Sequence, residues 1–200
     1  MRRVTAHSES YATAIAAIDA ANSDDPNRVT VRGSIQPLAL AHGRLAAEWI
    51  EHLAADASEP LLIAARSHHL RRWEVPRSTY PEGKAGYLRW RRDQKHRHAD
   101  DVGTILASAG YDSSVTERTQ LLIRREQLAT DAETQLLEDA ACLVFIETQL
   151  AAMEPRLDHD HLIEVIRKTA RKMSPAGVAV VGIMTLGERE IALLGEALAG

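Results

Sequence analysis

Apolar residues recur every three or four positions along most of the chain, which is the period of amphipathic α-helices. Ser, Asp and Pro residues precede several of these stretches, and Gly or Pro follows them, as is typical of helix starts and ends. No stretch shows the clear alternation of a β-strand, and RVTVRGSIQ is interpreted as a short linker. The pattern predicts roughly eight helices, at about residues 10–22, 37–55, 58–73, 87–109, 113–127, 131–153, 160–173 and 188–199.

Two segments fall outside this pattern. WEVPRSTYPEGKAG holds two prolines and two glycines and is predicted to be a loop long enough to carry function. SPAGVAVVGIM is an apolar segment between glycines that the pattern does not assign. The chain of 200 residues contains 45% apolar but only 4% aromatic residues, so its core must be mostly aliphatic. This composition favours packed helices, and the chain is predicted to be a single all-α domain.

Charge and cysteine content indicate the cellular compartment of the protein but say little about its function. A net charge of −4 favours no particular class of partner. The chain has a single cysteine, Cys142, which rules out an intrachain disulfide framework and fits a reducing cytoplasm. Cys142 lies in the apolar run CLVFI, so its thiol is expected to be buried and inert. The N-terminal MRRVTAHSES lacks the apolar stretch of a secretory signal, and Val178–Met184 is too short to span a membrane. We therefore expect a cytoplasmic protein without a membrane segment.

Polar residues on apolar stripes are the candidates for chemistry, because a buried polar group needs a partner or a metal. Three are histidines on separate predicted helices, His42, His69 and His98, and the fourth is Asp139. Such a set suits one divalent ion of Zn, Mn, Fe, Co or Ni if the helices converge. The alternative is that each group is satisfied separately, Asp139 by an arginine and His98 by solvent.

The doublet of His68 and His69 lies in LLIAARSHHLRRW, which has the pattern of a core-facing helix. The helical period places His69 on the inward stripe with Leu62 and Trp73. It places His68 about 100° around the helix, beside Leu61. His68 is therefore a further candidate metal ligand.

The order of these segments resembles the HD-domain superfamily of metal-dependent phosphohydrolases. AHGRLAAEW resembles its first histidine segment, LLIAARSHHL its His-Asp doublet segment, and HADDVGTILASAG a later histidine helix. LLIRREQLATDAETQLLEDAACL resembles the stretch that leads to its terminal aspartate, here Asp139. The resemblance implies an HD-like helical domain over residues 1–200, with a core at about 37–150, an N-terminal helix at 10–22 and C-terminal helices at 160–199. WEVPRS, GYLRWR and LEDAACLVF more closely resemble an uncharacterised family, domain of unknown function DUF4202, which brings no activity with it.

The chain departs from the HD pattern at the doublet. In one register His68 matches the superfamily histidine and His69 replaces the aspartate. In the other, His69 matches the histidine and Leu70 replaces the aspartate. Either register removes a carboxylate that can bridge two ions, so a single metal is favoured over a binuclear site.

Residues 66–98 contain ten Lys and Arg residues against three acids. The candidates to neutralise phosphoryl oxygens are Arg66, Arg72, Arg77 and Lys84. The leading hypothesis is a metal-dependent hydrolase of a nucleotide or another small phosphorylated metabolite. The alternatives are an HD-like module that binds nucleotide or RNA without turnover, with nucleic acid the less favoured partner, and, more weakly, an iron-dependent oxygenase.

Overall fold

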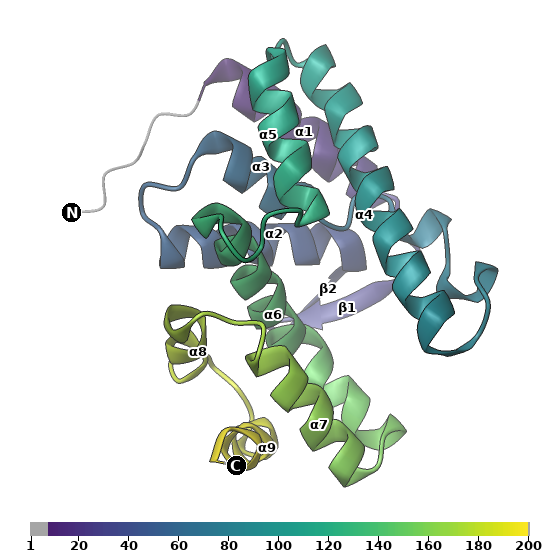
Figure 1. The fold of residues 1–200 in the computed structure, drawn as a ribbon, viewed down its shortest axis with the longest axis vertical. Helices are drawn as coiled ribbons and strands as arrows, with labels where there is room; N and C mark the ends of the chain where they lie inside the picture. Colours follow the sequence, from purple (N-terminus) through teal and green to yellow (C-terminus); the bar gives the residue numbers. More distant parts are fainter. Residues whose placement is uncertain (1–7, 200) are drawn as a thin grey trace.

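The computed structural model describes residues 8–199. The N-terminal residues 1–7, on which the expectation about a secretory signal rests, lie outside this range. The prediction of an all-α fold is confirmed, because the described part of the chain contains nine α-helices and one two-stranded sheet (Figure 1). Its helices are α1 (Glu9–Ser23), α2 (Leu38–Leu53), α3 (Glu59–Ser67), α4 (Gly83–Ser108), α5 (Ser113–Arg124), α6 (Ala132–Met153), α7 (His159–Ala170), α8 (Pro175–Val181) and α9 (Glu188–Ala199).

Side chains cap the starts of several helices. Side chains of Ser8, Ser58, Asp131 and Ser174 accept hydrogen bonds from the first turns of α1, α3, α6 and α8. The apolar segment that the sequence pattern left unassigned is therefore helix α8 and its C-terminal turn. Among residues 8–199, no helix is long and apolar enough to cross a membrane.

The predicted linker RVTVRGSIQ is instead a β-hairpin. Strands β1 (Arg28–Val31) and β2 (Ser34–Pro37) pair antiparallel, with Val31 opposite Ser34. Arg32 and Gly33 both have positive φ angles, +47° and +82°, as a two-residue hairpin turn requires. The β-branched run from Val29 to Val31 supports the strand pairing.

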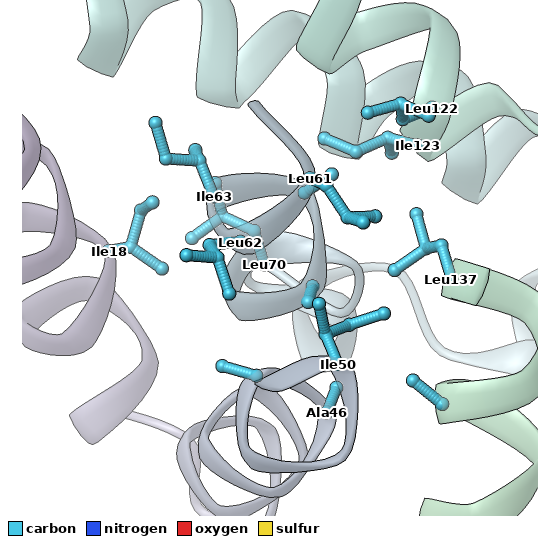
Figure 2. Packing of buried hydrophobic residues seen from close by; sticks show 14 of the residues in the cluster. Ile18, Ala46, Ile50, Leu61, Leu62, Ile63, Leu70, Leu122, Ile123 and Leu137 are labelled. Carbon is cyan, nitrogen blue, oxygen red and sulfur yellow. The ribbon is translucent and has the colours of Figure 1, made fainter. Parts of the chain in front are cut away.

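Helix α3 lies at the centre of the main core. All five residues from Leu61 to Ala65 are buried, so this helix is covered on every side. Figure 2 shows Ile18 of α1, Ile50 of α2 and Leu122 of α5 around it. Because α3 fixes the position of the chain that follows it, the core also fixes the position of the histidine doublet.

A second, smaller core joins the C-terminal helices. Ile146 and Leu150 of α6 pack with Leu162 and Ile166 of α7 and with Leu193 of α9. Helix α6 also contributes Leu137 and Val144 to the main core. This long helix therefore connects the two cores.

The predicted helix through the doublet is wrong in its C-terminal half. Helix α3 ends at Ser67, with His68 as its C-cap, and Arg71 adopts a left-handed conformation with φ of +49°. The doublet therefore lies in a turn, and the inward face predicted from the helical period does not apply. His68 is buried at 6% exposure, whereas His69 is only partly buried.

Candidate metal centre

Four histidines from three parts of the chain meet beside the main core. His42 lies on α2, His68 and His69 follow α3, and His98 lies on α4. The ring centre of His69 lies 5.3 Å from that of His42, 4.1 Å from that of His68 and 6.4 Å from that of His98. We call these four residues the histidine cluster.

Thr148 of α6 sets the hydrogen bonding of His42. The Thr148 hydroxyl donates to the carbonyl oxygen of Val144 at 2.7 Å and lies 3.1 Å from Nε2 of His42. Because the single hydroxyl hydrogen is used by Val144, we infer that Nε2 of His42 carries the hydrogen and donates to Thr148. Nδ1 of His42 then presents a lone pair, which accepts a hydrogen bond from Nδ1–H of His69 at 3.1 Å.

His68 is oriented by its own helix. Its Nδ1 lies 2.8 Å from the carbonyl oxygen of Ala65, which only accepts, so Nδ1 carries the hydrogen. Nε2 of His68 is therefore a bare acceptor, and it is buried without a hydrogen-bond partner. Histidines that bind metals in proteins are commonly held in this way, with the second ring nitrogen donating to a protein oxygen.

His98 is fully buried and poorly satisfied. The backbone carbonyl of Leu70 lies close enough to favour its protonated form, yet neither ring nitrogen reaches a partner in good hydrogen-bond geometry. Unpaired polar atoms in a protein interior are few and each calls for an explanation, such as a bound ion or water. In the cluster, Nε2 of His68 and both nitrogens of His98 are such atoms.

The four imidazoles are neutral at neutral pH. Burial, followed by the positive charge of Arg72, lowers the pKa of His42 to about 4 and that of His98 to about 3. Burial likewise holds the pKa of His68 and of His69 well below the ordinary value, helped by Arg125 for the former and by His68 for the latter. Neutral imidazole is the form that binds a metal ion.

Of the four predicted phosphate-binding cations, Arg72 lies beside the cluster. Its guanidinium carbon lies 4.3 Å from the ring centre of Trp90, and its charge affects the pKa of His42, His69 and His98. Within residues 8–199 its side chain has no carboxylate or carbonyl partner, and burial lowers its pKa to about 10. A partly buried arginine without an anion is unusual in proteins.

The other three predicted cations are placed differently. Arg66 donates two hydrogen bonds, of 2.6 and 2.7 Å, to the carboxylate of Asp19. Arg77 donates to the backbone carbonyls of Tyr80, Pro81 and Gly83 and so holds its own loop together. Lys84 is exposed at the start of α4. Arg66 and Arg77 are therefore already used by the fold.

Asp139 is buried, but its carboxylate faces α8. The backbone N–H of Ser174 donates to Oδ1 at 2.8 Å, the Ser174 hydroxyl to Oδ2 at 2.5 Å, and Gln135 to Oδ1 at 2.9 Å. A Cβ atom on Gly177 would lie 2.7 Å from the Asp139 carboxyl carbon, so the two elements are in close contact. Thr148, which touches His42, is nine residues further along α6, about 13–14 Å along the helix axis. The structure thus places Asp139 at the anchor of α8 rather than beside the histidines.

We expect Asp139→Ala to destabilise the protein by about 2–3 kcal/mol, because Ser174 and Gln135 lose charge-assisted hydrogen bonds in a buried place. The metal content should not change. Chemical denaturation and elemental analysis measure the two effects, with Asp100→Ala, an exposed position on α4, as the control. Loss of bound metal at unchanged stability would instead make Asp139 a ligand.

The structure also identifies residues that the sequence did not single out for these contacts. Thr148 orients His42, and Trp90 orients Arg72. Neither residue lies near its partner in sequence.

Cys142 is buried, as the sequence predicted. It lies beside the backbone of Thr169, and burial together with the charge of Glu138 raises the pKa of its thiol to about 12. Within residues 8–199, no three His, Cys, Asp or Glu side chains are already arranged to hold a metal ion.

Comparison with known proteins gives a family and no activity. The chain matches the family described as Domain of unknown function (DUF4202) over residues 12–194. It belongs to this family. No curated protein and no solved structure matches the chain. For this DUF4202 member, the argument for a function therefore rests on the site itself.

Proposed function

We propose that this protein is a metal-dependent phosphohydrolase that acts on a small phosphorylated molecule. The observation that carries the proposal is the histidine cluster, in which four neutral imidazoles are gathered in a buried place and two of them are oriented by protein oxygens. A metal ion would satisfy nitrogen atoms that otherwise remain unpaired in the interior.

The residues fit an ion in donor type and charge, and His69 would take its Nε2–H tautomer so that its Nδ1 can bind the ion. Two nitrogen ligands at the usual 2.0–2.1 Å from a metal, and about 100° apart, lie about 3.1 Å from each other. The Nδ1 atoms of His42 and His69 have this separation, 3.1 Å. A third ligand would require His68 or His98 to move towards the other two, because no three donors converge within residues 8–199. A ligand set made of imidazoles favours one divalent ion of intermediate softness, such as Zn, Fe, Co or Ni. Mn is less suited to it.

The chemistry divides between the ion and the chain. A bound divalent ion supplies a water molecule whose pKa is lowered to near 7. Arg72 would hold phosphoryl oxygens through two parallel hydrogen bonds, with its guanidinium plane supported by the Trp90 ring. His42 keeps its lone pair directed at His69 because Thr148 occupies its other nitrogen. These residues bind and orient, and they carry no negative charge that would repel a phosphate.

Elemental analysis of untagged protein tests the metal step. We expect about one equivalent of a transition metal in the wild type and less than a tenth of that in His69→Ala or His98→Ala, because each loses a ligand. His96→Ala removes an exposed histidine of the same helix and should retain the metal. Wild-type protein that holds less than a tenth of an equivalent after incubation with Zn, Mn, Fe, Co and Ni salts would contradict the proposal.

The second candidate is a binding module without turnover. The unpaired Arg72 favours it, since the arginine can hold an anion whether or not a reaction follows. Release of phosphate from a panel of phosphate esters by the metal-loaded protein separates the two candidates. Binding without release supports the module. Iron-dependent oxygen consumption would instead favour an oxygenase.

A further inference from the structure

Two cations of α4 stand out from the basic strip of residues 66–98. Most arginines of this strip are paired: Arg66 with Asp19, Arg89 and Arg92 with Asp93, Arg97 with Glu74. Arg91 and Lys95 have no carboxylate partner within residues 8–199, although both are partly buried. The guanidinium carbon of Arg91 lies 5.7 Å from the ring centre of Tyr87.

The positions of Arg91 and Lys95 relate them to the histidine cluster. Residues 91, 95 and 98 share one face of α4, because they are separated by four and three positions. Along the helix axis, Lys95 lies about 4–5 Å and Arg91 about 10 Å before His98. Arg91 also lies close enough to Arg72 to lower its pKa. The two cations therefore lie on the same face of α4 as His98.

The local charge on this surface is strongly positive. Arg125 lies close to Arg91 and Lys95, and its guanidinium donates to Glu138 at 3.1 Å. Glu138 is the acid that acts on this group of cations, and it is already paired with Arg125. Like charges at positions i and i+4 of a helix repel each other, so a further anion beside Arg91 and Lys95 would stabilise this part of α4.

We propose that Arg91 and Lys95 form a second anion subsite next to Arg72, so that the ligand of this protein carries at least two phosphoryl groups. The inference rests on the proposed function for the first subsite, at Arg72. The first phosphoryl group lies at Arg72 near the histidines, and the second is held further along α4.

Calorimetric titration of metal-free protein in EDTA with phosphate and with pyrophosphate tests the subsite. We expect pyrophosphate to bind about tenfold more tightly than phosphate or better, because it engages additional charge-assisted contacts. In the double variant R91Q/K95Q this preference should fall to about twofold, while phosphate binding stays within about twofold of the wild type. Arg72→Gln should weaken both ligands by about tenfold.

The matched control is R89Q/R92Q. It removes the same net charge from the same helix, but from residues that already pair with Asp93. It should retain the preference for pyrophosphate. If the double variant R91Q/K95Q does not give the wild-type circular dichroism spectrum, the single variants are compared, and each should reduce the preference by about threefold.

Equal affinity of the wild type for the two anions, or a preference that survives in R91Q/K95Q, would overturn the subsite. Affinity for single-stranded RNA that rises with length, without a preference for pyrophosphate, would overturn it in favour of a nucleic-acid surface. Because these titrations contain no metal, they separate the subsite from the proposed reaction. Pyrophosphate preference without bound metal in the elemental analysis retains the subsite and contradicts the hydrolase.

Discussion

Metal-free protein should lose stability steeply as the pH falls from 6.5 to about 4. Burial lowers the pKa of His42 to about 4 and that of His98 to about 3, whereas both titrate near 6.5 in the unfolded chain. Between these values the unfolded state binds more protons than the folded state, so protons favour unfolding. Each of the two histidines should cost about 3 kcal/mol by pH 4, and His68 adds to this loss in the same direction. Above pH 6.5 their contribution is constant.

A total of about 6 kcal/mol is comparable to the stability of an ordinary domain, so the metal-free protein should unfold in mild acid. Urea denaturation followed by circular dichroism at pH 7.5, 6, 5 and 4, in EDTA, measures the loss. His98→Leu should reduce the slope with pH, and His96→Ala should not. The acids whose pKa is lowered, such as Asp131 with a pKa of about 2, lose their contribution mainly below this window. A free energy of unfolding that stays constant from pH 7 to 4.5 would contradict the burial of neutral imidazoles.

Gly43→Ala should destabilise the protein by about 3 kcal/mol or more and should also disrupt the histidine cluster. A Cβ atom at Gly43 would lie 2.3 Å from the carbonyl oxygen of Arg66, a backbone atom that cannot rotate away. Helices α2 and α3 must therefore separate, which costs packing energy. His42 precedes this glycine and His69 lies three residues beyond Arg66, so separation of the helices should also lengthen the 3.1 Å contact between the two imidazoles.

Denaturation and elemental analysis of the Gly43→Ala protein measure both effects. Gly195→Ala is the matched control, since Gly195 lies in α9 and a Cβ there meets no atom within 4 Å. That change should be neutral or stabilise the protein by up to about 1 kcal/mol, because alanine favours the helix. Wild-type stability and metal content in Gly43→Ala would show that α2 and α3 are not packed as closely as described.

The sequence predicted the fold well where local signals and long apolar stripes agree. Helix α6 begins after Asp131 and ends at Met153, as its cap and stripe indicated. The helix through the histidine doublet was predicted too long because no glycine or proline marks its end. Contacts distant in sequence hold the turn instead: Asn22 accepts from the N–H of Arg71, and Arg97 donates to the Arg71 carbonyl. Such long-range contacts do not appear in the periodic pattern of apolar residues.

The candidate site was predictable in its residue types and less so in its arrangement. Inward histidines on separate helices could be found from the stripes, and the structure brings His42, His69 and His98 together with His68. The stripes could not tell that Asp139 faces α8, because the inward side of a helix as long as α6 borders different neighbours along its length. Nor could the stripes predict that Arg66 is paired with a carboxylate whereas Arg72 is not. The partner of Arg66 is Asp19, which is 47 positions away in the sequence.

The buried thiol of Cys142 has a practical consequence for labelling. Thiol reagents attack the thiolate, and a pKa of about 12 leaves almost none of it at pH 7 to 8. The native protein, with this single cysteine, should therefore react very little with maleimides. A cysteine introduced in place of the exposed Lys84 would accept a spin label or fluorophore selectively, without any need to alter the core around Cys142. Such a label would report on the start of α4 in otherwise wild-type protein.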